Sequence, residues 1–354
     1  MRKVGIVKDK RYMEHNMGVY HPENPKRLEV IYEMLEDSDI KDKFIEIPPR
    51  EATKEEICYI HSPEYLEMIA QTEGKAHVTL DPDTSTCEKS YRVALLAAGG
   101  LCEAIAHVIE GKIENAFALI RPPGHHAERS RAMGFCIFNN VAIATRYVQR
   151  VHSIEKVLIV DWDLHHGNGT QHAFEDDPTV LYFSTHQYPY YPGTGAVEEQ
   201  GIGEGRGFTV NAPLSYGYGD AEYAEIYKSL LAPIAIEFKP DLILVSAGFD
   251  IYEGDPLGGM SVSPIGFATL TRILMQIADK CCNGRLVITL EGGYNLNGLR
   301  QSVKAVLKEL LDMNFTDPAE VAKKAREDMV SRVINRVKQV HSDHWNCLRN
   351  QEEV

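Results

Sequence analysis

The segment Val157-Leu-Ile-Val-Asp-Trp-Asp-Leu-His-His-Gly-Asn-Gly-Thr-Gln171 joins an apolar, β-branched run to a cluster of carboxylates and imidazoles. Side chains alternate between the two faces of a strand, so Asp161, Asp163 and His165 are expected to point the same way. Acids and histidines after a strand can also cap a helix or form a turn. Two acids in register, followed by two histidines and a Gly-Asn-Gly turn, favour half of a metal site instead.

Apolar runs alternate with helical segments along most of the chain. Such alternation is typical of a mostly parallel sheet that is covered by helices on both faces. The predicted strands cover residues 3–7, 116–120, 157–160, 180–183, 242–246 and 286–290, and the predicted helices cover 25–35, 63–71, 91–109, 139–151, 221–238, 264–280 and 299–311. The chain is therefore expected to form an α/β fold in which residues 1–313 make one domain.

The segment 314–354 differs in composition, because it is rich in Lys, Arg and Glu and contains no strand pattern. Its apolar residues recur at three- and four-residue steps, at Val330, Val333, Ile334, Val337 and Val340. This spacing predicts a C-terminal amphipathic helical extension. The narrow apolar stripe must be buried against its own domain or against a second subunit, so the sequence is also compatible with a homo-oligomer.

The composition excludes several classes of protein. The chain has 354 residues, 44% of them hydrophobic and 25% charged, as in a soluble globular protein. We see no apolar run near the roughly 18 residues that span a bilayer and no signal-peptide core, so we expect no membrane contact and a cytoplasmic location. Seven cysteines without a C-x-x-C pair suit a reducing compartment and argue against a thiolate metal site. The net charge of -14 argues against nucleic acid as a partner and permits basic peptides or polyamines.

Chemically active residues follow four of the predicted strands. The strand 116–120 leads into Arg121-Pro-Pro-Gly-His125-His126, the strand 242–246 into Ala-Gly-Phe-Asp250, and the strand 286–290 into Glu-Gly-Gly-Tyr294. The fourth is the opening segment. Functional residues of open α/β sheets gather beyond the carboxyl ends of the strands, so we expect these four ends to converge on one site.

The residue types at these strand ends are those of a metal-assisted hydrolase. Asp163, His165 and Asp250 would supply O, N and O ligands and leave a position for water and substrate, as a catalytic Zn²⁺ requires. Fe²⁺ or Co²⁺ would fit the same ligands. Two carboxylates offset the charge of the dication, so a separate general base is needed, and His126 is the candidate, with His125 as an electrostatic or proton-shuttle partner.

Tyr294 lies on a glycine-containing loop that could bring its phenol to the substrate carbonyl and stabilise an oxyanion. A tandem histidine in a turn is otherwise a surface pair, and a lone loop tyrosine is otherwise a packed aromatic. Because acids and histidines also follow the other predicted strands, we favour catalytic roles for the two histidines and for Tyr294 over these alternatives.

Five ordered motifs together resemble those of the zinc-dependent histone deacetylase superfamily, over roughly residues 1 to 312. They are His21-Pro-Glu-Asn-Pro-x-Arg, Arg121-Pro-Pro-Gly-His-His-Ala, Asp161-Trp-Asp-Leu-His-His-Gly-Asn-Gly-Thr-Gln, Gly248-Phe-Asp-x-x-x-Gly-Asp-Pro-Leu-Gly-Gly and Glu291-Gly-Gly-Tyr. Within the third motif, the Asp161-Trp-Asp and His166-Gly-Asn-Gly variants resemble class II deacetylases and bacterial histone deacetylase-like amidohydrolases. The resemblance implies a three-layer α/β/α, arginase-like fold and hydrolysis of an acylated amine to carboxylate and free amine.

The resemblance also assigns roles to individual residues. It implies metal binding by Asp163, His165 and Asp250, catalysis by His125, His126 and Tyr294, and orientation of the two histidines by Asp161 and Asn168. Because an amide stabilises imidazolium less than a carboxylate does, His126 should stay a neutral base more readily than His125. A structural potassium ion is implied beside the zinc, held by the side chains of Asp161 and Ser184 and the backbone carbonyls of Asp163, His165 and Thr185.

The substrate channel is implied by four further positions. Phe135 and Tyr191 match aromatic tunnel walls, and Gly134 would offer its carbonyl to the substrate N–H. Leu257 stands where polyamine-selective relatives carry an acid, which favours acyl-lysine peptides or other small acylated amines that carry no charge.

Three other functions stay open. Asp81 and Asp83 in an entrance loop keep an acetylpolyamine amidohydrolase as the alternative. A non-catalytic acyl-lysine binding module is disfavoured because every catalytic position is filled. Arginase-like manganese hydrolysis is disfavoured because it would want more bridging carboxylates.

Overall fold

A single parallel sheet forms the centre of the protein. The computed structural model describes residues 2–314 and 316–349. Eight strands pair in the order β2-β1-β5-β10-β9-β6-β7-β8, all parallel. The strands are β1 (Val4–Val7), β2 (Ile45–Glu46), β5 (Asn115–Ala118), β6 (Val157–Asp161), β7 (Val180–Gln187), β8 (Thr209–Leu214), β9 (Leu242–Ala247) and β10 (Leu286–Leu290). The central strands are apolar and fully buried, as strands covered on both faces must be.

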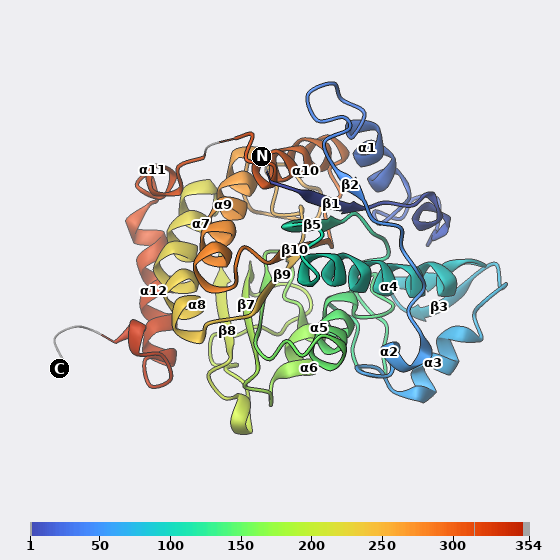
Figure 1. Cartoon of the computed structure of the whole chain (residues 1–354). Coiled ribbons are helices and arrows are strands. Elements are labelled where there is room, and N and C mark those ends of the chain that lie inside the picture. Colours follow the sequence, from blue (N-terminus) through green and yellow to red (C-terminus); the bar gives the residue numbers. More distant parts are fainter. Residues whose placement is uncertain (1, 315, 350–354) are drawn as a thin grey trace.

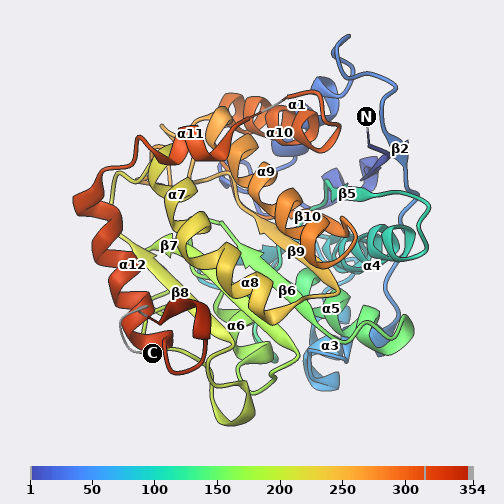
Figure 2. The same ribbon diagram turned by 60° about the vertical axis from the view of Figure 1, so that its left-hand side comes forward.

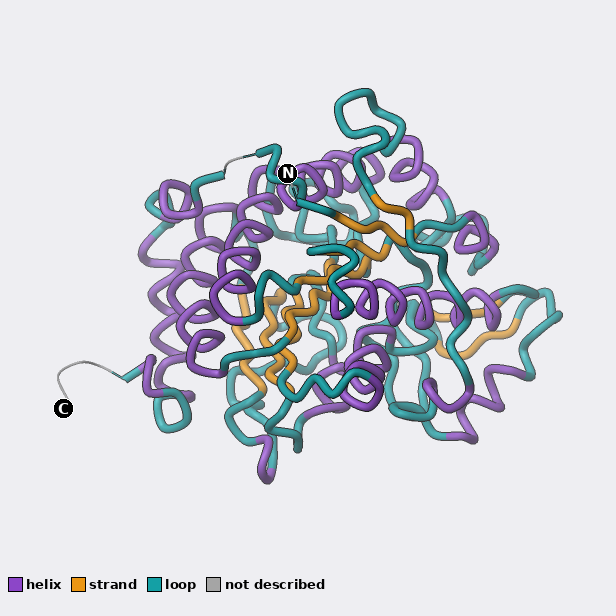
Figure 3. Tube along the Cα trace, in the orientation of Figure 1, coloured by secondary structure: helices purple, strands orange, loops and turns teal. Residues whose placement is uncertain are grey.

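Helices cover both faces of this sheet (Figures 1 and 2). One layer contains α1 (Lys26–Met34), α7 (Asp220–Ile226), α8 (Ala232–Phe238), α9 (Pro264–Cys281) and α10 (Leu296–Leu310). The other contains α4 (Ser90–Ile109), α5 (Asn140–Val151) and α6 (Asn168–Phe174), with α2 (Lys54–Ile57) and α3 (Pro63–Ala70) beside them. The strands lie between the two groups of helices in Figure 3. The expected three-layer α/β/α arrangement is therefore confirmed.

All six predicted strands are present, and seven further strands and α-helices were not predicted. These are β2, the edge strand β8, the hairpin of β3 (Val78–Asp81) and β4 (Thr84–Thr86), and the helices α2, α6 and α11 (Pro318–Ala322). The single helix predicted over 221–238 is wrong in detail, because a π-helical segment, Tyr227–Leu231, separates α7 from α8. Pro233 lies in the first turn of α8 and has no N–H for the preceding turn, so the hydrogen-bond spacing changes just before it.

Helix α4 corrects one expectation from composition. This 20-residue helix is long and apolar enough to cross a membrane, judged by length and composition alone. The prediction that no apolar run approaches the length of a membrane span is therefore wrong. In the structure 78% of its most apolar window is buried, and the helix packs against α5 and β5. Core helices of this kind meet the same criterion as membrane spans.

The C-terminal segment folds back onto the sheet. Helix α12 (Glu327–His341) packs against β8 and α7, and the short α11 (Pro318–Ala322) packs against α7 and α9. The stripe residues Val330, Val333, Ile334 and Val337 are buried in the main core. The apolar stripe is thus covered by its own chain, whereas the division at 313/314 stays a prediction. Residues 315 and 350–354 of the proposed extension, and Met1, lie outside the described residues.

Candidate active site

The four strands that carry the motifs are neighbours in the sheet. Strands β5, β10, β9 and β6 are consecutive, and their carboxyl ends lead into the His125-His126 turn, the Glu291 loop, the Asp250 loop and the Asp163 segment. The topology therefore brings the four predicted clusters to one edge of the sheet, as expected.

Three predicted ligands converge there. One ligand atom each of Asp163, His165 and Asp250 lies within 4.8 Å of the other two. The Nδ1 atom of His165 is 3.2 Å from Oδ1 of Asp163 and 3.1 Å from Oδ2 of Asp250. Both carboxylates are buried. This group of oxygen and nitrogen donors fits a divalent cation.

Backbone amides fix the direction of both carboxylates. Oδ2 of Asp163 accepts a hydrogen bond from the N–H of Gly292 at 2.9 Å, and Oδ1 of Asp250 accepts one from the N–H of Leu164 at 2.9 Å. The second oxygen of Asp250 accepts no hydrogen bond from the described residues. Each carboxylate therefore turns one oxygen to the backbone of another loop and the other to His165, whose own backbone N–H also donates to Oδ1 of Asp163 at 2.9 Å.

Negative charge is concentrated at this point. Burial and the charge of Asp163 raise the pKa of Asp250 to about 7. Burial opposes protonation of His165, but the hydrogen bond to Asp163 and the nearby negative charge of Asp250 raise the pKa of this histidine to about 9. The group therefore stabilises positive charge placed between its members.

The tandem histidines lie beside these ligands, with their ring centroids 4.0 Å apart. Nδ1 of His125 is 3.1 Å from Oδ2 of Asp161, and Nδ1 of His126 is 2.8 Å from Oδ1 of Asn168. Burial lowers the pKa of His125, but Asp163 and Asp161 outweigh it and raise the value to about 10. Burial and the neighbouring histidines hold the pKa of His126 well below its usual range. The two adjacent imidazoles therefore differ in charge, with His126 the neutral one.

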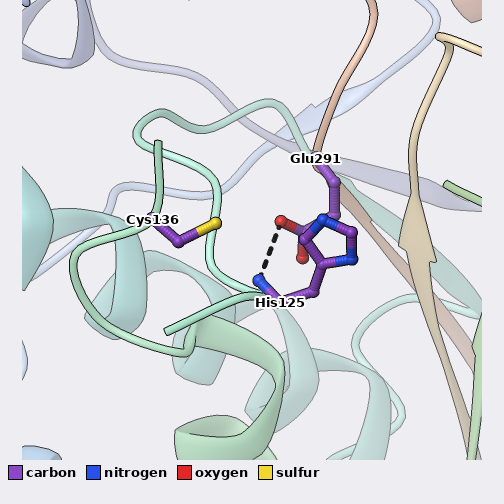
Figure 4. Close-up of side chains that lie close together, drawn as sticks. All are labelled: His125, Cys136 and Glu291. Atoms are coloured by element: carbon purple, nitrogen blue, oxygen red, sulfur yellow. Dashed lines mark hydrogen bonds between the residues drawn. The ribbon is translucent and has the colours of Figure 1, made fainter. Parts of the chain in front are cut away.

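Glu291 holds the histidine turn through hydrogen bonds, and the one that it accepts from the N–H of His125 is drawn in Figure 4. One carboxylate oxygen accepts from the N–H of Gly124 at 2.7 Å and of His125 at 3.3 Å, and the other accepts from the hydroxyl of Ser246 at 3.0 Å. His125, Cys136 and Glu291 lie close enough together to hold a metal. However, both oxygens of the buried Glu291 carboxylate already accept hydrogen bonds from the protein, so no metal is needed to explain its burial. Glu291 therefore has a structural role, because it connects the end of β10 to the turn that carries His125 and His126.

The loop that carries Tyr294 is held at two points. Oδ2 of Asp255 accepts from the backbone N–H of Tyr294 at 2.7 Å. The buried guanidinium of Arg27 lies 5.1 Å from the centroid of the tyrosine ring and donates to the carbonyl oxygens of Gly293 and Glu291. These contacts fix a glycine-containing loop and thereby place the phenol of Tyr294.

A cavity of about 150 Å³ opens in front of these residues. It is lined by the predicted residues His125, His126, Gly134, Phe135, His165, Tyr191, Leu257 and Tyr294, together with Asp83, Pro123 and Gly292. The ring of Tyr191 meets His126 edge-on at 5.2 Å, and that of Phe135 meets Tyr294 edge-on at 5.8 Å. The structure thus gathers the four predicted substrate-contacting residues around one opening.

Comparison with known proteins identifies the family. The family model described as the histone deacetylase domain matches residues 21–310. The chain belongs to the histone deacetylase family. Histone deacetylase clr3 of Schizosaccharomyces pombe is 39% identical over 99% of this chain and 53% of its own length. Polyamine deacetylase HDAC10 of Homo sapiens is 39% identical over 93% of this chain and 50% of its own length.

Two other similar proteins match over nearly their full length. A probable deacetylase of Archaeoglobus fulgidus is 37% identical over 98% of this chain and 99% of its own length. The crystal structure of the HDA15 HD domain is 37% identical, with a TM-score of 0.89, and the match covers 98% of this chain and 97% of that one. By contrast, the chain spans about half the length of the fungal and human relatives.

Within this deacetylase domain, Asp161, Ser184 and Thr185, three of the residues expected around potassium, lie on two adjacent strands. Strands β6 and β7 pair Asp161 with Ser184, and Thr185 follows in the same strand. Oδ1 of Asp161 accepts from the N–H of Asp163 at 3.1 Å, and its Oδ2 accepts from the hydroxyl of Tyr182 at 3.1 Å. The potassium ion itself stays a prediction.

Asp83 lines the cavity of the deacetylase domain and was not among the predicted site residues. It lies between β3 and β4, and its Oδ1 accepts from the N–H of Gly134 at 3.0 Å. The sequence analysis identified Asp83 only as an acid in an entrance loop, because the neighbouring residues do not indicate that the β3–β4 hairpin lies at the cavity.

Proposed function

We propose that this protein is a metal-dependent deacylase that hydrolyses the amide of acetyl-lysine, or of a related acylated amine, to a carboxylate and a free amine. One observation carries the proposal. The carboxylates of Asp163 and Asp250 converge with the imidazole of His165 at a cavity that is lined by His165, His126 and Tyr294. Metal ligands, a neutral base and a phenolic donor at one opening are the parts of an amide hydrolase.

Asp163, His165 and Asp250 would hold the metal, which is zinc by family resemblance. When bound, zinc polarises a substrate carbonyl and makes water more acidic. Potassium would stabilise the segment around Asp161 and Ser184.

The protein's own side chains would move the protons and stabilise the developing charge. His126, being neutral, accepts a proton from the attacking water, and Tyr294 donates a hydrogen bond to the carbonyl oxygen as it becomes negative. A protonated histidine then gives the leaving nitrogen its proton, so that water and amide become carboxylate and amine. His125 carries positive charge, which disfavours protonation of His126 in the ground state.

The shape of the opening favours an acylated lysine. The rings of Phe135 and Tyr191 and the side chain of Leu257 offer apolar walls to the alkyl stem, which carries no charge once its amine is acylated. The carbonyl of Gly134 would accept a hydrogen bond from the substrate amide. Leu257 has no carboxylate with which to attract a second amine.

A second function, acetylpolyamine hydrolysis, is favoured by one observation. The half-buried carboxylate of Asp83 lines the same cavity and could attract a distant ammonium. Assays of an acetyl-lysine peptide and acetylspermidine would separate the two functions. We expect a higher kcat/KM for the peptide. A reversed ratio would favour the polyamine, and binding of the peptide without turnover of either substrate would refute the deacylase.

A further inference from the structure

A row of hydrogen bonds leads from the candidate base His126 toward the surface. Nδ1 of His126 is 2.8 Å from Oδ1 of Asn168. The amide Nδ2 of Asn168 donates to Oε1 of Glu128 at 2.5 Å. The same oxygen of Glu128 lies 2.8 Å from Nδ1 of His172, a side chain that is 41% exposed. Glu128 therefore stands between a buried amide and solvent.

The surroundings of Asn168 allow only one orientation of its amide. Besides Glu128, the Nδ2 atom faces the carbonyl oxygen of His126 at 3.3 Å and the sulfur of Met133 at 3.5 Å. All three neighbours are acceptors. A rotated amide would turn its oxygen toward the carboxylate of Glu128 and toward a carbonyl, and would leave buried donors without partners. Oδ1 of Asn168 must therefore face His126.

This orientation decides which nitrogen of His126 carries the proton. An amide oxygen only accepts hydrogen bonds, so Nδ1 of a neutral His126 must be the N–H donor. Its Nε2 atom then holds the lone pair. A ring with the opposite tautomer would present an N–H where a base is needed. The general-base role of His126 thus depends on the direction of the Asn168 amide.

We propose that Glu128 is a positioning residue, which fixes the amide of Asn168 and thereby holds His126 in the tautomer with a free Nε2. This inference rests on the proposed function, because the tautomer matters only if His126 acts as a base. A carboxylate suits this task because either oxygen can accept the N–H of Asn168, and the amide oxygen of a glutamine at this position could accept it as well. Hydrogen bonds from His172 and Asn168 outweigh burial and keep the pKa of Glu128 low, so the group is ionised.

Three variants separate this role from general effects on the fold. Glu128→Ala removes the acceptor, and Glu128→Gln keeps an oxygen at the same distance along the side chain. The matched control is His172→Gln, which removes the other partner of Glu128 and leaves the contact to Asn168 intact. Each would be compared with the wild type for kcat and KM on an acetyl-lysine peptide, for zinc content and for thermal unfolding.

The tautomer itself can be measured without turnover. Long-range ¹H–¹⁵N correlation spectra of protein labelled at histidine distinguish a protonated from an unprotonated ring nitrogen, and His126→Gln identifies the signals of His126. We expect a protonated Nδ1 in the wild type, in His172→Gln and in Glu128→Gln. We expect a mixture of tautomers in Glu128→Ala.

The kinetic expectation follows from the tautomer. In Glu128→Ala kcat should fall about tenfold or more, whereas KM and zinc content should equal those of the wild type. The loss should be smaller than that of removing the base itself, because a general base contributes about a hundredfold or more. Glu128→Gln and His172→Gln should stay within about threefold of the wild type. The proposal would be overturned by an unprotonated Nδ1 in the wild type, by an unchanged kcat in Glu128→Ala, or by a loss in Glu128→Gln as large as in Glu128→Ala. Wild-type turnover of the peptide tests the proposed function separately.

Discussion

The imidazole Nδ1 of His165 lies between the carboxylates of Asp163 and Asp250, 3.1 Å from Oδ2 of the latter. Strands β6 and β9 are adjacent, so the loops that follow them bring these residues together. A single N–H cannot make good hydrogen bonds to both carboxylates, whereas a cation can be shared by all three. Gly248 and Gly292 make room for this approach, because a Cβ at either position would collide with Asp163.

Asp250→Asn is expected to lose bound zinc. The amide is a poorer ligand than the carboxylate, and it removes half of the negative charge that offsets the dication. Metal analysis after dialysis measures the loss. Asp83→Asn is the matched control, because it removes a carboxylate from the same cavity without touching a ligand, and it should keep its zinc. Full zinc occupancy in Asp250→Asn would refute the ligand assignment.

Tyr294→Phe is expected to lower kcat on the order of a hundredfold while zinc content stays unchanged, because the phenol stabilises charge that develops on the substrate. Steady-state assays on an acetyl-lysine peptide measure the change. Tyr216→Phe removes a hydroxyl from a side chain that is 76% exposed, and it should be neutral. Undiminished turnover in Tyr294→Phe would remove this tyrosine from the mechanism.

Substrate choice is expected to respond to charge at the opening. Leu257→Glu adds a carboxylate to the cavity wall, so its preference for acetylspermidine over an acetyl-lysine peptide should rise about tenfold or more. Asp83→Asn should shift the same ratio in the opposite direction. Competition assays with both substrates give the ratio directly, and Leu257→Gln separates charge from size. If all three variants keep the wild-type ratio, neither position sets specificity.

The C-terminal segment should make stability sensitive to acid. His341 is buried, neither of its ring nitrogens has a hydrogen-bond partner among the described residues, and burial together with His344 lowers its pKa from 6.5 to about 4. The unfolded chain therefore binds a proton before the folded protein does, so stability is fully present above pH 6.5 and falls as the pH drops toward 4.

His341→Leu should remove about 2 kcal/mol of the stability difference between pH 7 and pH 4.5. Urea unfolding of variant and wild type at both pH values measures that difference. The other buried histidines cancel in the comparison, because both proteins contain them. An identical pH dependence in the two proteins would show that His341 does not resist protonation.

Residues that follow apolar strands were the most predictable part of the site. Asp163 and Asp250 could be placed because the strands before them are apolar and buried, and because parallel strands end at a common edge. Strand β8 was missed because it lies at the sheet edge and includes Asn211 and Pro213, which interrupt a strand pattern.

Residues that depend on tertiary contacts could not be predicted. Asp83 reaches the cavity only because the β3–β4 hairpin folds against Gly134. In the sequence, Glu128 is only a polar residue two positions after the histidine pair. Its hydrogen bond with Asn168 depends on the packing of two separate segments of the chain. The burial of α4 likewise depends on the helices and strands around it, since composition alone does not distinguish a core helix from a membrane span.

We propose that this chain hydrolyses an acyl-lysine amide with a metal held by Asp163, His165 and Asp250. The most direct measurement follows the hydrolysis of an acetyl-lysine peptide by protein stripped of metal with a chelator, before and after zinc is returned. We predict that hydrolysis is lost on stripping and restored by one equivalent of zinc in the wild type but not in Asp250→Asn. Hydrolysis that persists without metal, or its absence in zinc-loaded wild-type protein, would show that this chain is not a metal-dependent deacylase.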